Sequence, residues 1–166
     1  MDRDSLRALQ APLKSTYKDD PSQALITLKA NGTLGENVSC KVDTGRAIAE
    51  AGLHPATGGD GSLLCSGDML LEALVACAGV TLGAVATAID VKIDDGRVSA
   101  EGDLDFRGTL GVDRDAPVGF KAIRLRFELD SSASREELDT LLRLTERYCV
   151  VLQTLARTPE LSASLS

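Results

Sequence analysis

A stretch of 17 residues without a charged side chain, Ala73–Ile89, constrains this chain more than any other feature. Its length is at the lower limit for crossing a bilayer, it is rich in alanine, and no excess of Lys or Arg flanks it. Ser66 is suited to cap a helix, and Asp68 would lie at the positive end of its dipole. We therefore predict a helix from about Gly67 to Ile89, buried on all sides within a folded protein.

Alternation of apolar and polar residues predicts several strands around this helix. Each patterned segment has one apolar and one polar face, which is typical of antiparallel sheets with one face in water. The first two segments form a hairpin with a turn at Asn31-Gly32, and the next two form a wide hairpin. The predicted strands are Ala24–Ala30, Val38–Asp43, Arg97–Phe106, Ile123–Asp130 and a short last strand at Leu161–Leu165.

Helical signals complete the predicted organisation. Asp4–Lys14 has weak helical character, which Pro12 should limit, within an N-terminal arm over residues 1–20. A second helix begins at Ser134 with a capping box and continues to about Leu152. Gly45–Leu64 is expected to be a long loop. Strand pairs and helices come in blocks, so the fold class is α+β and residues 1–166 form one domain.

The composition excludes some functions. A net charge of −7 and an aromatic content of 3% argue against a nucleic-acid binder, which would need a basic face and stacking rings. The first ten residues are charged and lack the apolar run of a secretory signal, so we expect a cytoplasmic protein that is not a membrane partner. In a reducing compartment, the four cysteines are not expected to be standing disulfides.

Other catalytic motifs are missing from the sequence. There is no phosphate-binding loop and no Gly-x-Ser-x-Gly elbow, and the single histidine, His54, is predicted to be a loop residue. The cysteines have no Cys-x-x-Cys spacing, so we expect no metal and no cofactor. Taken singly, each cysteine is most simply a small buried side chain. Cys40 fits a strand core, while Cys65 is either core or a spare thiol.

Three segments resemble one family. Ser66–Cys77 reads SGDMLLEALVAC, Gly58–Gly61 precedes it as a Gly-rich approach, and Glu146–Cys149 reads ERYC. They resemble the central helix and the second cysteine of the osmotically induced protein C and organic hydroperoxide resistance (OsmC/Ohr) family. The sequence departs from the family pattern where Cys65-Ser66 replaces Asn-Pro, and where Val150 follows Cys149 instead of proline.

The resemblance implies an OsmC-like fold, with antiparallel sheets packed around a long central helix in an intertwined homodimer. It implies a thiol peroxidase for organic hydroperoxides, in which Cys77 is oxidised to a sulfenic acid, forms a disulfide with Cys149 and is restored by a dithiol reductant. Burial would raise the pKa of Cys77, and the start of its own helix is distant, so an activating cation is expected. Arg46 is the first candidate, oriented by Asp68. Lys14 and Lys18 are weaker ones.

Two other functions stay open from the sequence. One is a non-enzymatic member of the same fold that binds small molecules or senses redox state. The other is a structural dimer whose cysteines are incidental core residues. The retained cysteine pair favours the peroxidase, whereas the lack of a securely aligned arginine favours the alternatives.

Overall fold

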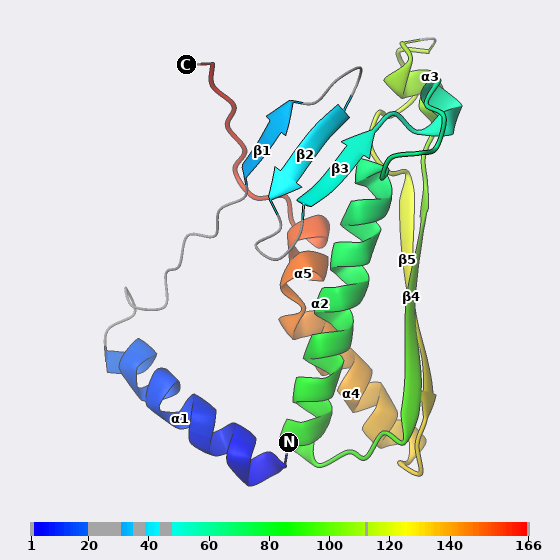
Figure 1. The fold of residues 1–166 in the computed structure, drawn as a ribbon. Coiled ribbons are helices and arrows are strands. Elements are labelled where there is room, and N and C mark those ends of the chain that lie inside the picture. The colour runs from blue at the N-terminus through cyan, green and yellow to red at the C-terminus, as the bar shows by residue number, and fades with distance from the viewer. Residues whose placement is uncertain (1, 20–30, 35–38, 44–47, 112, 166) are drawn as a thin grey trace. The chain divides into compact units, whose positions relative to one another are not determined.

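The computed structural model describes residues 2–19, 31–34, 39–43, 48–111 and 113–165, and Figure 1 shows its elements. Five α-helices, a short 3-10 helix at Pro55–Thr57 and five strands are present in these ranges, in agreement with the predicted α+β class. In chain order the α-helices and strands are α1 Arg3–Asp19, β1 Asn31–Leu34, β2 Ser39–Asp43, β3 Ile48–Gly52, α2 Ser66–Ile89, β4 Asp95–Asp103, α3 Phe106–Thr109, β5 Ala122–Asp130, α4 Arg135–Tyr148 and α5 Val150–Ala156.

The chain divides into two compact units. Unit 1 contains residues 1–14, 73–99 and 126–166, and unit 2 contains residues 15–72 and 100–125. Unit 1 therefore holds most of α2, the first part of β4, the last part of β5, and the two C-terminal helices α4 and α5. Unit 2 holds the three-stranded sheet and the loop that joins β4 to β5.

The core of unit 1 lies against one face of α2. Leucine, valine and alanine side chains from α2 pack with Val91 and with Leu141 of α4, which is completely buried. The buried residues of α2 are Leu74, Ala78, Leu82, Val85 and Ala86. Their spacing of three or four residues defines a single helix face. Within one chain α2 is therefore not buried on all sides, contrary to the sequence prediction.

The opposite side of α2 in unit 1 is apolar and exposed. Val80 is 76% exposed, and the other exposed positions share the same helical spacing: Ala73, Ala76, Gly83 and Ala84. By length and composition α2 could also cross a membrane, and 28% of its most apolar window is buried. The prediction was wrong because the sequence pattern shows only that the whole surface of this helix is apolar. Packing within a single chain covers only one face of α2.

The end of α2 is set by Asp90, which has a positive φ of 63°. The Val91 N–H donates to the Ala86 carbonyl at 2.9 Å, which closes the last turn as in a Schellman motif. Glycine is the usual residue at such a position, and aspartate is one of the few others that adopt it without large strain. The predicted end of this helix is confirmed.

The predicted capping box at the start of α4 is also confirmed. The Ser134 hydroxyl accepts from the Glu137 N–H at 3.3 Å, and the Glu137 carboxylate accepts from the Ser134 N–H at 2.7 Å. The second helix is not continuous to Leu152, however. It breaks at Cys149, whose backbone is extended with φ −71° and ψ 107°, so that α5 begins at Val150.

Unit 2 is organised around an antiparallel sheet in the order β1-β2-β3. Thr33 pairs with Lys41, and Lys41 with Glu50. The expected loop Gly45–Leu64 thus contains a strand, and Leu64 forms a parallel bridge with Ala51. The short β3 lacks strong alternation and is stabilised by its ladder to β2, which local sequence does not reveal.

Three further predictions concern unit 2. Asn31-Gly32 lies in β1 and not in a turn, because these residues pair with Asp43 and Val42. The predicted strand Ala24–Ala30 lies outside the described residues. The predicted strand Val38–Asp43 is confirmed from Ser39 onward as β2, and Val38 lies outside the described residues.

The long strands β4 and β5 pair with each other, as predicted. The Asp94 N–H donates to the Asp130 carbonyl and the Lys121 N–H to the Asp103 carbonyl, so the pair is antiparallel. Phe106 was predicted to lie in β4 but begins α3, after the Asp105 side chain caps the Arg107 N–H.

Both chain ends differ from the prediction. Residues 161–165 form no strand, and Leu161 and Leu165 are exposed, because no described strand forms a ladder with this segment. At the other end, α1 continues through Pro12 to Asp19. A proline inside a helix removes one backbone hydrogen bond, which this helix tolerates.

Candidate active site

Cys77 and Cys149 lie side by side within unit 1. Cys77 comes from the middle of α2 and is partly exposed, whereas Cys149, between α4 and α5, is completely buried. Both thiols are free, and a hydrogen bond between them affects the pKa of each. Two thiols from helices far apart in the sequence thus share one site.

The break at Cys149 creates the polar part of this site. The Cys149 N–H completes α4 by donating to the Thr145 carbonyl, and the Cys149 carbonyl accepts from Gln153 to start α5, each at 2.9 Å. The first N–H groups of any α-helix have no partner within that helix. At the start of α5, these groups belong to Val150 and Val151, and both hydrogen-bond to the sulfur of Cys77.

These donors set the ionisation of Cys77. Burial acts to raise its pKa, but hydrogen bonds from the Val151 N–H, the Cys149 thiol, the Thr81 hydroxyl and the Val150 N–H outweigh it. The pKa of Cys77 therefore lies below its ordinary value. Because hydrogen bonds to a charged group are among the strongest, donors of this kind favour the thiolate even without a cation.

The pKa of Cys149 moves in the opposite direction. Burial is the main reason that this pKa is raised, and the N–H groups of Leu152 and Val151 offset it only in part. The neighbouring Cys77 adds to the rise, since its thiolate both accepts a hydrogen bond from the Cys149 thiol and repels a second negative charge. Of the two, Cys77 is the thiol that ionises first, and Cys149 keeps its proton.

These donors are not predicted by the sequence. The distance of Cys77 from the N-terminus of its own helix predicts an activating cation, yet the N–H groups that lower the pKa of Cys77 are those at the start of α5. Only the extended backbone at Cys149 exposes those N–H groups, and no local sequence pattern predicts this backbone conformation. Thr81 could have been found, since residues four apart on a predicted helix lie on the same face.

The candidate cations are not placed near Cys77 by the structure. Arg46 lies outside the described residues, and Lys14 and Lys18 belong to the part of α1 where only the backbone is described. Asp68 lies in the first turn of α2 and is exposed. Nine residues of helix advance roughly 14 Å and two and a half turns, so Asp68 and Cys77 emerge from opposite faces of α2.

Asp68 instead lines a hollow of about 360 Å³ in unit 2, together with His54, Cys65, Phe106 and other side chains. His54 lies in the loop after β3, as predicted. Its Nδ1 accepts from the Ala56 N–H at 3.0 Å, and its ring stacks on Phe106 with centroids 4.9 Å apart. Within the described parts of the chain, no group of three metal-binding side chains is close enough to hold an ion.

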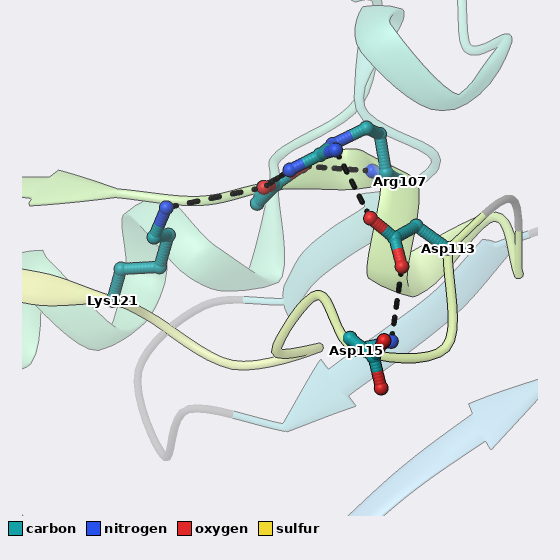
Figure 2. Close-up of polar contacts among 5 residues, drawn as sticks. Arg107, Asp113, Asp115 and Lys121 are labelled. Atoms are coloured by element: carbon teal, nitrogen blue, oxygen red, sulfur yellow. Dashed lines mark hydrogen bonds and ion pairs between the residues drawn. The ribbon is translucent and has the colours of Figure 1, made fainter.

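Arg107, in the loop between β4 and β5, forms ion pairs with carboxylates. The Arg107 guanidinium donates to Asp105 at 2.6 Å and to Asp113 at 3.0 Å, and the Lys121 Nζ lies 3.9 Å from the Asp105 carboxylate. Figure 2 shows Arg107 pointing toward Asp113. The hydrogen bond from Arg107 lowers the pKa of Asp105 to about 2. These exposed ion pairs stabilise the loop conformation, and in them the Arg107 guanidinium is bound by the carboxylates of Asp105 and Asp113.

The fold and the paired thiols define an α+β protein with a dithiol site built on a long central helix. The family model for OsmC-like proteins matches residues 59–164, and the chain belongs to this family. No curated protein matches the chain by sequence.

Solved structures agree with this assignment. An OsmC-like protein from Mycoplasma pneumoniae is 20% identical, with a TM-score of 0.66 over 80% of this chain and 89% of its own. An organic hydroperoxide resistance protein OsmC from Legionella pneumophila is 18% identical, with a TM-score of 0.62 over 79% and 90%. An organic hydroperoxide resistance protein from Elizabethkingia anophelis is 20% identical, with a TM-score of 0.61 over 78% and 89%. At these identities the likeness shows the fold.

Proposed function

We propose that this protein is a thiol-dependent peroxidase for organic hydroperoxides, in which Cys77 reacts and Cys149 resolves. The observation that carries the proposal is the pair of free thiols, Cys77 of α2 and Cys149 between α4 and α5, that share one site; the directions of their pKa values, lowered at Cys77 and raised at Cys149, support it. A reactive thiolate beside a protonated thiol is the arrangement that a two-cysteine mechanism needs. Family membership and the names of the relatives point to the same chemistry.

The proposed cycle begins at the Cys77 thiolate. Its sulfur attacks the distal peroxide oxygen, the O–O bond breaks, and the alkoxide takes up a proton and leaves as an alcohol. Cys77 is then a sulfenic acid, oxidised by two electrons. The Cys149 sulfur attacks it, the S–S bond forms and water leaves. A dithiol reductant, of the kind available in the cytoplasm where we place this protein, returns two electrons to the disulfide.

The substrate class follows from the surroundings of Cys77. No charged side chain occurs on α2 between Glu72 and Asp90. An apolar environment of this kind favours bulky organic peroxides over hydrogen peroxide, because the organic group gains from leaving water.

Mass spectrometry of the full chain after treatment with cumene hydroperoxide tests this function. We expect a Cys77–Cys149 disulfide in the wild type and a trappable sulfenic acid at Cys77 in Cys149→Ser. Cys65→Ser is the matched control and should behave as the wild type. An unreacted Cys77, or its over-oxidation beside a free Cys149, contradicts the mechanism. Specific ligand binding or reversible oxidation without turnover would favour the non-enzymatic alternatives.

Arg46 stays our proposed cation, with Asp68 as its orienting carboxylate. Asp68 and Cys77 lie on opposite faces of α2. Asp68 would therefore act with Arg46 on the Cys77 of a second subunit, across the dimer interface. Arg46→Ala should raise the pKa of Cys77 and slow turnover, and Arg46→Lys should restore part of the rate, because lysine lacks the planar fork of arginine. Equal rates in Arg46→Ala and the wild type would exclude Arg46 as the activating cation, and Lys14 and Lys18 would be the next candidates.

We further propose that the chain is a single OsmC-like domain, because the family match includes parts of both compact units. We also propose that this domain forms a homodimer. The exposed apolar side of α2 supports a dimer, because a contiguous surface of this kind typically covers an interface. Val80→Lys should shift sedimentation from twice the 17.5 kDa chain mass toward the monomer. Val118→Lys, at another exposed valine, should not. A wild-type monomer would refute the dimer.

A further inference from the structure

The break between α4 and α5 leaves the carbonyl groups at the end of α4 without their usual helical partners. In a continuous helix, the Glu146 carbonyl would accept from the N–H of residue 150, four residues later. The extended backbone at Cys149, with ψ 107°, turns the chain before that bond can form, and a new helix starts at Val150. The last carbonyls of a helix then need other partners, which a side chain can supply.

Gln153 supplies the partner for Glu146. Its side-chain amide Nε2 donates to the Glu146 carbonyl at 2.8 Å, across seven positions in the sequence. The backbone N–H of Gln153 donates to the Cys149 carbonyl, and the Cys149 N–H donates to the Thr145 carbonyl, each at 2.9 Å. One partly buried residue of α5 is therefore bonded both to Cys149 and to the last turn of α4.

The packing of α5 is shallow. The helix has seven residues, none of its side chains is fully buried, and Val150 is 70% exposed. The direction in which the chain leaves the buried Cys149 therefore depends on hydrogen bonds as well as on packing. Among the side chains described in these two helices, only that of Gln153 forms a hydrogen bond between them. The neighbouring Thr154 hydroxyl donates to the Val150 carbonyl, at 2.9 Å and within α5.

We propose that Gln153 is a positioning residue for the resolving thiol: by bonding α5 to the last turn of α4 across the break, its side-chain amide holds Cys149 beside Cys77. The inference rests on the proposed function in taking Cys149 as the thiol that resolves. Resolution joins two sulfurs of one chain, so it depends on how often they meet in the right geometry. A looser break would let Cys149 move away from Cys77 and would lower its effective concentration there.

This effective concentration can be measured without peroxide. The full chain is equilibrated with mixtures of reduced and oxidised glutathione, and peptide mass spectrometry quantifies the Cys77–Cys149 disulfide. Each protein disulfide that forms takes two electrons from the two thiols and converts one glutathione disulfide into two glutathione thiols. The equilibrium constant therefore has units of concentration and reports how well the fold holds the two sulfurs together. Urea titration of the same samples measures the stability of the fold separately.

Four variants separate the amide donor from the space that it fills. In Gln153→Met, which keeps a similar volume without a donor, we expect the equilibrium constant to fall by about 2–10-fold, the range for loss of one neutral hydrogen bond. Gln153→Glu should show the same fall, because a carboxylate only accepts, whereas Gln153→Lys keeps a donor and should restore most of the wild-type value. Thr154→Val, which removes only a bond within α5, is the matched control and should equal the wild type.

The outcomes are distinct. A wild-type constant in both Gln153→Met and Gln153→Glu overturns the inference, as does a Gln153→Lys value no higher than that of Gln153→Met. An equal fall in Thr154→Val, or a wild type that forms no Cys77–Cys149 disulfide in glutathione, also overturns it. Turnover of cumene hydroperoxide is measured separately. If the constants change as expected but the wild type does not reduce the peroxide, the role of Gln153 in holding Cys149 stands and the proposed function fails.

Discussion

Val150→Pro is expected to weaken the activation of Cys77 with little net change in the stability of the protein. Val150 is the first residue of α5 and is 70% exposed, so its side chain contributes little to packing. Proline is favoured at this helix position, because its φ is already helical and the missing N–H has no partner within the helix. The preceding residue must be extended, and Cys149, with ψ 107°, meets this condition.

The magnitude follows from two opposing effects. Proline restricts the unfolded chain, which stabilises by about 0.4–1 kcal/mol, whereas loss of the Val150 N–H bond to Cys77 costs about 0.5–1.5 kcal/mol. For a chain of this size, the net change in melting temperature should therefore stay within about 4 °C. The same substitution removes one N–H from the Cys77 sulfur, so the pKa of Cys77 should rise and its alkylation at neutral pH should slow.

Calorimetry and alkylation kinetics measure the two effects in the same samples. Val150→Ala controls for loss of the side chain and should leave the alkylation rate unchanged. Gln153→Pro is the opposite case: its N–H donates to the Cys149 carbonyl, so proline there should destabilise by about 3 kcal/mol. A marked destabilisation by Val150→Pro would refute the extended backbone at Cys149, and unchanged alkylation would refute the role of the Val150 N–H.

Three further outcomes are expected. Leu141→Ala should lower the free energy of unfolding by about 3–5 kcal/mol in urea titration, because Leu141 is completely buried in the core of unit 1. Asp90→Gly should raise it by up to about 1 kcal/mol, because glycine adopts the positive φ at the end of α2 without strain; a loss of stability would contradict this account. Cys77 should be alkylated before Cys149 as pH rises from acidic values, since its pKa is lowered and that of Cys149 is raised, and simultaneous labelling would contradict the assignment.

Features governed by neighbouring residues could be predicted from the sequence. The charge-free run forms α2, the alternation around Leu125 and Phe127 forms β5, and Ser134 with Glu137 forms the capping box. Each depends on side chains within one or two turns or one strand. The family could be recognised for the same reason, because its motif is contiguous along α2 and its second cysteine ends α4.

Only the tertiary structure decided how Cys77 is activated and how α2 is covered. Periodicity treated Cys149 as one more position on a continuous helix, whereas packing breaks the helix there and turns the N–H groups of α5 toward Cys77. A thiol pKa depends on the donors within a few ångströms, and three of the four that act on Cys77 come from a segment more than 70 residues away in the chain. In the same way, an apolar sequence makes α2 able to be buried on every side, but the packing of a single chain buries only one of them.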